Sequence, residues 1–114
     1  MLGDMAGRPF EADLDVRDGT VVVAFRGEFD MAAKEPAAAA LAAAVSADPK
    51  SIVVDLRGLS FMDSTGVNCL IRAKSMAEPL GRRIALLNGS GQPHQVLELT
   101  RLVEVFEMVE ELPR

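Results

Sequence analysis

The distribution of apolar and polar positions predicts a chain that opens with a pair of strands. From Phe10 to Arg17 apolar and charged residues alternate with a period of two, which is typical of a strand with one buried face. Asp18-Gly19 is a two-residue hairpin signal. The apolar run Thr20–Phe25 therefore predicts a second, antiparallel and more buried strand, and Gly27-Glu28-Phe29-Asp30 is expected to end it.

The rest of the chain predicts alternating helices and strands. Alanine, the best helix former, dominates 32–45, with Pro36 in the first turn, where its missing N–H costs nothing. Unbroken apolar runs indicate buried strands, and apolar residues three or four apart indicate helices. The further strands expected are 51–56, 84–87 and 105–109, and the further helices are 67–76 and 93–100. The helix residues expected to face the core are Val67, Leu70, Ile71 and Ala77, then Val96, Leu99 and Val103.

The predicted order is β-β-α-β-α-β-α-β, which places the chain in the α/β class. Strand-helix repeats imply parallel neighbours with right-handed crossovers, and the opening hairpin makes the central sheet mixed. We expect about five strands, with the helices mainly on one face. Residues 1–9, which hold two glycines and a proline, are predicted to be a flexible leader, and residues 10–114 a single domain.

Composition and charge exclude several classes of function. The 114 residues are 49% hydrophobic and carry a net charge of −5, which fits one folded domain and disfavours nucleic acid or an anionic membrane as partner. No apolar run reaches about 18 residues, so no membrane insertion is expected. A single cysteine, Cys69, and a single histidine, His94, exclude a Cys/His metal site within one chain. No metal or cofactor is predicted, and the reducing cytoplasm is the expected compartment.

Asp63-Ser64-Thr65-Gly66 is the most informative segment, because it stands where a strand gives way to a helix. In one interpretation these residues only cap the helix, since Asp, Ser and Thr are favoured at that position. In the other, the Ser64 hydroxyl is exposed and accepts a phosphate. The phosphate would add about −1.5 to −2 charges next to Asp63, near Asp30, and would disturb a contact with a partner.

No residue pattern supports an enzyme. A nucleophile elbow requires glycine two residues before the serine, and Met62 is there. His94 is expected at the surface in the first turn of its helix. Gly89-Ser90-Gly91 lacks the residues of a phosphate-binding loop and predicts a turn in which Ser90 or Asn88 caps the next helix. Cys69 is interpreted as a buried, inert thiol. Arg82 and Arg83 are interpreted as solvated charges.

The whole pattern resembles the STAS domain family, in particular the small anti-sigma factor antagonists of bacteria. Three segments match: Gly27-Glu28-Phe29-Asp30 after the second strand, the strand Ile52–Leu56 followed by Phe61–Gly66, and Leu97–Phe106 at the third helix. The resemblance covers about residues 10–110 and implies the STAS fold. The middle segment is the most specific of the three.

The resemblance implies a switch operated by a serine. Ser64 would be phosphorylated by an ATP-dependent anti-sigma factor serine kinase of the GHKL type, and a phosphatase would reset it. The unphosphorylated protein would bind that kinase and release a sigma factor. Asp30 and Asp63 would be the acidic neighbours, Thr65 a secondary acceptor, and Gly66 the small residue that lets the partner's backbone approach. A monomer is the default expectation.

Two further expectations remain open at this stage. The alternative function is a STAS module acting as a scaffold without phosphorylation, or as a transporter accessory subunit, in which Ser64 is only a helix cap. Arg101 stands where the family often has glycine. Because a left-handed backbone costs arginine more than glycine, we expect the exit from the third helix to be built differently.

Overall fold

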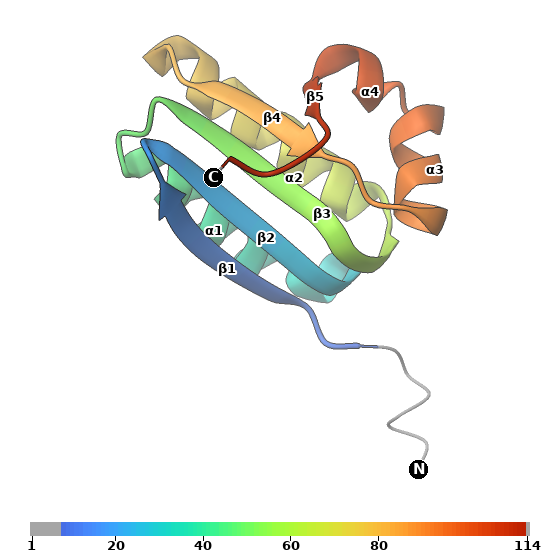
Figure 1. Cartoon of the computed structure of the whole chain (residues 1–114). Coiled ribbons are helices and arrows are strands. Elements are labelled where there is room, and N and C mark those ends of the chain that lie inside the picture. Colours follow the sequence, from blue (N-terminus) through green and yellow to red (C-terminus); the bar gives the residue numbers. More distant parts are fainter. Residues whose placement is uncertain (1–7, 114) are drawn as a thin grey trace.

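The computed structural model describes residues 8–113, so the predicted leader, residues 1–9, lies almost wholly outside the described residues. Five strands form one sheet in the order β1-β2-β3-β4-β5. β1 is antiparallel to β2, and every other neighbouring pair is parallel, so the predicted α/β class and mixed sheet are confirmed (Figure 1). The strands are β1 (Glu11–Arg17), β2 (Thr20–Phe29), β3 (Ser51–Met62), β4 (Arg83–Leu87) and β5 (Glu107–Val109). The helices are α1 (Lys34–Ser46), α2 (Ser64–Ala77), α3 (Gly91–Leu99) and α4 (Leu102–Val105), with short 3-10 helices η2 (Met31–Ala33) and η3 (Glu78–Leu80).

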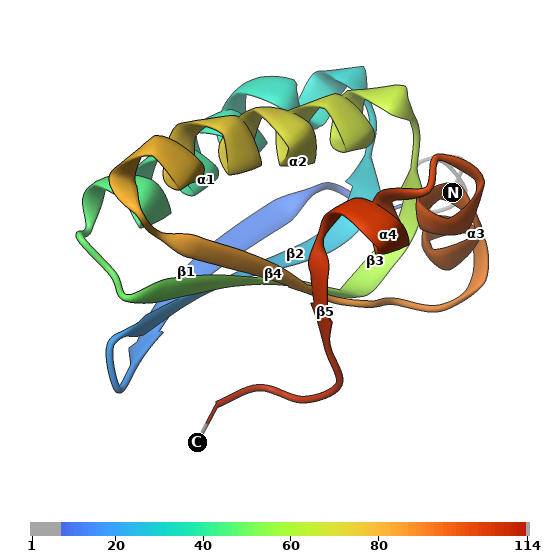
Figure 2. The ribbon, with the colours of Figure 1, turned by 90° about the horizontal axis from the view of Figure 1, so that it is seen from above.

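The two faces of the sheet are covered differently. α1 and α2 lie side by side on one face, as predicted, whereas α3 and α4 lie beside the ends of β3 and β4 (Figure 2). The core fills the space under α1 and α2 with alternate strand residues such as Val23, Val54 and Leu86. The segment after β5 crosses the opposite face, where the Arg17 guanidinium donates to the Pro113 carbonyl (Figures 1 and 2).

A buried carboxylate anchors this opposite face. Asp55 is 8% exposed, and its oxygens accept hydrogen bonds from both the backbone and the guanidinium of Arg57 at 3.0 Å. Burial alone would raise the pKa of the Asp55 carboxyl, but the hydrogen bonds from Arg57 outweigh it and hold the pKa below its ordinary value. The apolar pattern of 51–56 therefore contains one charge that the fold pairs within the same strand.

Both strands that lead to the predicted site are longer than the sequence indicates. β2 continues through Gly27 to Phe29, and β3 continues from Leu56 to Met62, although residues 27–30 were expected to end the first of them. Two register shifts let the pair continue, and Gly27 has a φ of +87° beside the Pro9 carbonyl. Such bulges are invisible to a simple period-two pattern.

Several predicted core positions prove to be exposed. Ile71 and Leu99 are 43% and 85% exposed, and Ala73 and Leu97 are buried in place of them. Val16, predicted on the buried face of its strand, is 67% exposed, because β1 is the outer strand of the sheet. The short helix α4 was not predicted, and it takes the place of the expected start of the last strand at residue 105.

Arg101 joins α3 to α4 in a left-handed conformation, with φ at 62°. The expectation that arginine forces a different exit from the third helix is therefore wrong. The Arg101 amide donates to the Glu98 carbonyl at 3.1 Å, so the turn is closed by the backbone. The chain accepts a conformation that costs a non-glycine residue about 1–2 kcal/mol.

We expect Arg101→Gly to raise the free energy of unfolding by about 0.5–1 kcal/mol, because glycine relieves the strained φ and loses only part of the gain to unfolded-state entropy. Urea denaturation measures the change. Arg101→Ala is the control, since it removes the side chain without relieving the backbone and should give no gain. Equal stability of the two variants would show that the left-handed backbone at Arg101 is not strained.

Candidate functional site

The site begins where β2 and β3 end in step. Phe29 pairs with Met62, and the Asp63 amide donates to the Phe29 carbonyl at 3.2 Å. The next residues, Asp30 and Asp63, therefore lie beside each other at the same edge of the sheet. The predicted proximity of these two acidic residues is confirmed by the pairing of the strands that precede them.

Both aspartates cap the helical segments that follow them. Asp30 accepts a hydrogen bond from the Ala32 amide at 3.1 Å, and Asp63 accepts one from the Thr65 amide at 2.8 Å. Each cap uses one oxygen, Oδ1, in the manner of an ordinary helix N-cap. The two backbone conformations are nearly identical, with φ of −115° and −111°. The site is thus built from two copies of the same local motif.

Ser64 is the first residue of α2 and is exposed to solvent. Because Asp63 is the N-cap, the hypothesis that Ser64 serves only as a cap loses its basis. Helix N-termini favour negative charge through their free amides and their dipole. A phosphate on the Ser64 hydroxyl would therefore be compatible with the folded helix while adding charge at the surface.

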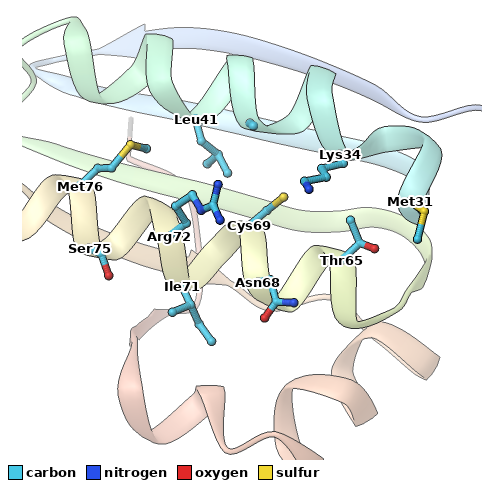
Figure 3. Close-up of a pocket in the computed structure, with 11 residues that line it drawn as sticks. Met31, Lys34, Leu41, Thr65, Asn68, Cys69, Ile71, Arg72, Ser75 and Met76 are labelled. Carbon is cyan, nitrogen blue, oxygen red and sulfur yellow. The ribbon is translucent and has the colours of Figure 1, made fainter.

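Gly66 has a role different from the one that the resemblance implied. It is buried, and a Cβ placed on it would lie 2.4 Å from Met62 Cγ and 3.2 Å from Phe29 Cγ. The missing side chain thus makes room for the protein's own core and not for the backbone of a partner. Thr65, by contrast, is half-buried and faces the groove between α1 and α2 (Figure 3).

Gln92 is a site residue that sequence analysis missed. Its side-chain Oε1 accepts from the Met62 amide at 2.8 Å, and its Nε2 donates to the Met62 carbonyl at 2.9 Å. β3 pairs with β4 only as far as Asp55, so Met62 has no strand partner on that side. The Gln92 amide supplies the two bonds that a neighbouring strand would have given. It holds the backbone two residues before Ser64.

The family model for the STAS domain matches residues 11–113. The chain belongs to the STAS domain family. An anti-sigma F factor antagonist of Lysinibacillus sphaericus is 34% identical over 94 residues, which are 82% of this chain and 80% of the relative. The STAS domain is therefore recognised along almost all of the described chain.

Solved structures of relatives share the fold. An anti-sigma factor antagonist from Mycobacterium paratuberculosis matches with a TM-score of 0.79 at 24% identity, over 91% of this chain and 88% of that one. The antagonist SpoIIAA matches in its unphosphorylated form (TM-score 0.68, 26% identity, 91% and 90% coverage). SpoIIAA of Bacillus in its phosphorylated form matches with a TM-score of 0.67 at 29% identity, over 90% of this chain and 93% of that one.

The relative from Lysinibacillus sphaericus and SpoIIAA are named as antagonists, and on that ground the prediction that the chain is not an enzyme is confirmed. Across residues 8–113, none of the helices of this STAS domain has the length and apolarity needed to cross a membrane.

Other candidate residues of the STAS domain have mostly structural roles. His94 is at the surface as predicted, with Nδ1 2.7 Å from Asn88 Nδ2 and Nε2 3.0 Å from Glu98. The prediction that Ser90 or Asn88 caps α3 with its side chain is wrong. Ser90 stands at the N-cap position but its side chain makes no capping hydrogen bond, and the Asn88 side chain bonds to His94 instead.

Two predictions about charged and reactive groups need correction. Arg82 is not a solvated charge, because its side chain is only 17% exposed. Its guanidinium bonds to Asp48 at 2.8 Å and donates to the Val45 carbonyl at the end of α1. Cys69 is half-buried in the groove between α1 and α2 and not fully buried. Burial nevertheless raises the pKa of its thiol, as expected for an unreactive cysteine.

Gly66→Ala is expected to lower the free energy of unfolding by about 1–2 kcal/mol, because the added methyl group overpacks the contact with Met62 and Phe29. Urea denaturation tests this. Ser64→Ala, an exposed change two residues earlier in the same turn, should stay within about 0.5 kcal/mol of the parent. If Gly66→Ala were as stable as Ser64→Ala, the conclusion that position 66 packs against Met62 and Phe29 would be wrong.

Gln92→Glu is expected to loosen the start of the site. One carboxylate oxygen still accepts from the Met62 amide, but the other faces the Met62 carbonyl and repels it, at a cost of about 1–2 kcal/mol. Hydrogen exchange of the Met62 amide should accelerate accordingly. The matched control is Gln95→Glu, which adds the same charge to an exposed position of α3. Equal exchange rates of the Met62 amide in the two variants would show that Gln92 does not hold the backbone at Met62.

Proposed function

We propose that this STAS domain is a cytoplasmic anti-sigma factor antagonist controlled by phosphorylation of Ser64. The unphosphorylated form binds an anti-sigma factor that is an ATP-dependent serine kinase of the GHKL type, and a sigma factor is released. Phosphorylation by the bound kinase ends the contact, and a phosphatase restores it. The protein acts as a monomer that forms a complex with its partner.

The observation that carries the proposal is the exposure of Ser64 at the start of α2, directly after the carboxylate of Asp63 that caps this helix. A kinase can reach this hydroxyl without unfolding the helix. The phosphate would stand beside Asp63 and near Asp30, where the surface is already acidic. A partner surface complementary to the two carboxylates alone would then face about two additional negative charges.

The similarity to named antagonists supports the same conclusion. The relative from Lysinibacillus sphaericus acts on an anti-sigma F factor by its name, and SpoIIAA exists in unphosphorylated and phosphorylated forms. The alternative of an unphosphorylated scaffold or transporter accessory subunit is less well supported, because Asp63, and not Ser64, caps α2. Ser64 is left without a capping task that would explain its presence.

Two substitutions at Ser64 test the switch. Ser64→Ala should bind the cognate anti-sigma factor as the parent does, whereas Ser64→Asp should bind at least about tenfold more weakly, a loss of about 1.4 kcal/mol. Titration calorimetry measures both affinities. Ser46→Asp is the control for added charge alone, because Ser46 is an exposed serine at the C-terminal end of α1. Equal affinity of Ser64→Ala and Ser64→Asp would refute the switch.

Incubation with the kinase and ATP, followed by mass spectrometry, locates the phosphate. It is expected on Ser64 in the parent and in Thr65→Ala, and absent in Ser64→Ala. Phosphate on Thr65 in the parent would transfer the role to the neighbouring residue, and phosphate on neither would refute the proposal.

A further inference from the structure

A groove runs between α1 and α2 on the outer side of the helical layer. Its volume is about 650 Å³, and its walls come from both helices and from η2 (Figure 3). It starts at Thr65, the residue after Ser64, and extends along α2 to Met76. The groove is thus continuous with the site of the proposed switch but reaches well beyond it.

The groove concentrates exposed apolar side chains. Met31, Ile71 and Met76 are 77%, 43% and 38% exposed, and all three line it. Methionine side chains are flexible and polarisable, so they adapt to the shape of a bound apolar surface. From α1 the groove is lined by Lys34, Ala38 and the buried Leu41.

The charge of the groove is opposite to that of the chain. The protein carries a net charge of −5, yet Lys34 and Arg72 line the groove and no Asp or Glu does. Both side chains reach into the space between the helices, on either side of Cys69 (Figure 3). Within residues 8–113 neither cation makes an ion pair, whereas the following ones do: Arg17, Arg26, Arg57, Lys74, Arg82 and Arg83.

We propose, building on the function proposed above, that this groove receives an acidic amphipathic helix of the anti-sigma factor. Carboxylates of that helix would pair with Lys34 and Arg72, and its apolar side would cover Met31, Ile71 and Met76. An extended strand fits poorly, because the walls are helices whose backbone groups are already bonded to each other. A membrane surface is disfavoured by the negative charge of the rest of the chain.

The arrangement would also fix the direction of the partner. Asp30 and Asp63 each directly precede a residue that lines one end of the groove, Met31 and Thr65, whereas Lys34 and Arg72 line the groove itself. A bound helix must therefore place its negative charges away from the two aspartates. This arrangement of negative charge at one end and positive charge along the groove would fix the position and direction of the bound helix more than it would strengthen binding.

Charge reversal in the groove tests the proposal. Lys34→Glu and Arg72→Glu are each expected to weaken binding of the anti-sigma factor about tenfold in calorimetry. Lys50→Glu is the matched control, because it changes the net charge equally at an exposed position outside the groove. It should leave the affinity unchanged. The parent complex should also weaken with added salt more steeply than the Lys34→Glu complex does.

An apolar pair of variants tests the other half of the surface. Ile71→Ser should weaken the same complex several-fold, whereas Leu80→Ser, which is 57% exposed in η3 outside the groove, should not. All five substituted residues are exposed, so the variants are expected to fold, and thermal melting curves verify this: Lys34, Lys50, Ile71, Arg72 and Leu80.

The outcomes separate this proposal from the switch itself. If Lys34→Glu and Arg72→Glu bind like the parent while Ser64→Asp loses binding, the groove proposal is overturned and the switch stands. If the parent fails to bind the anti-sigma factor, both are overturned. If sedimentation shows that the chain alone forms a dimer that Arg72→Glu dissociates, the occupant is a second copy of this chain and the proposed helix is wrong.

Discussion

The pairing of β2 with β3, which continues through two register shifts to the last residue of each strand, is the constraint on which the site depends. Parallel strands present their carboxyl ends at one edge, and here Phe29 and Met62 are partners at that edge. One residue further, each chain turns into a helical segment with an aspartate as its cap. A slip of this register by one residue would separate the two carboxylates and turn Ser64 relative to its neighbours.

The requirement for glycine at position 66 follows from the same geometry. Gly66 lies against Met62 and Phe29, the pair that fixes the register, so the start of α2 packs directly on the strand ends. On the other side of Met62, Gln92 replaces the missing strand with a side-chain amide. Ser64 is exposed, but the backbone on both sides of it is held by the strand pairing, by the Gln92 amide and by the packing of Gly66.

Much of this was predictable from the sequence, and the exceptions have physical causes. The hairpin at Asp18-Gly19, the sequence of the five strands along the chain and the strand-helix junction at Asp63 follow from local patterns that the structure preserves. The lengths of β2 and β3 do not, because bulges and Gly27 interrupt the pattern without ending the pairing. Gln92 was missed because its task, bonding to the backbone of a residue 30 positions away, leaves no local signal.

The hairpin turn at Asp18-Gly19 lies at the opposite end of β2 from Asp30, so the molecule is divided along its strands. One end holds the carboxylates and the serine, and the other holds the hairpin turn and the loop before β3, whose Lys50 amide donates to the Gly19 carbonyl. Surface turns of this kind accept insertions readily. The turn is consequently the natural place to attach a fluorophore or a reporter module that follows complex formation without touching the contact itself.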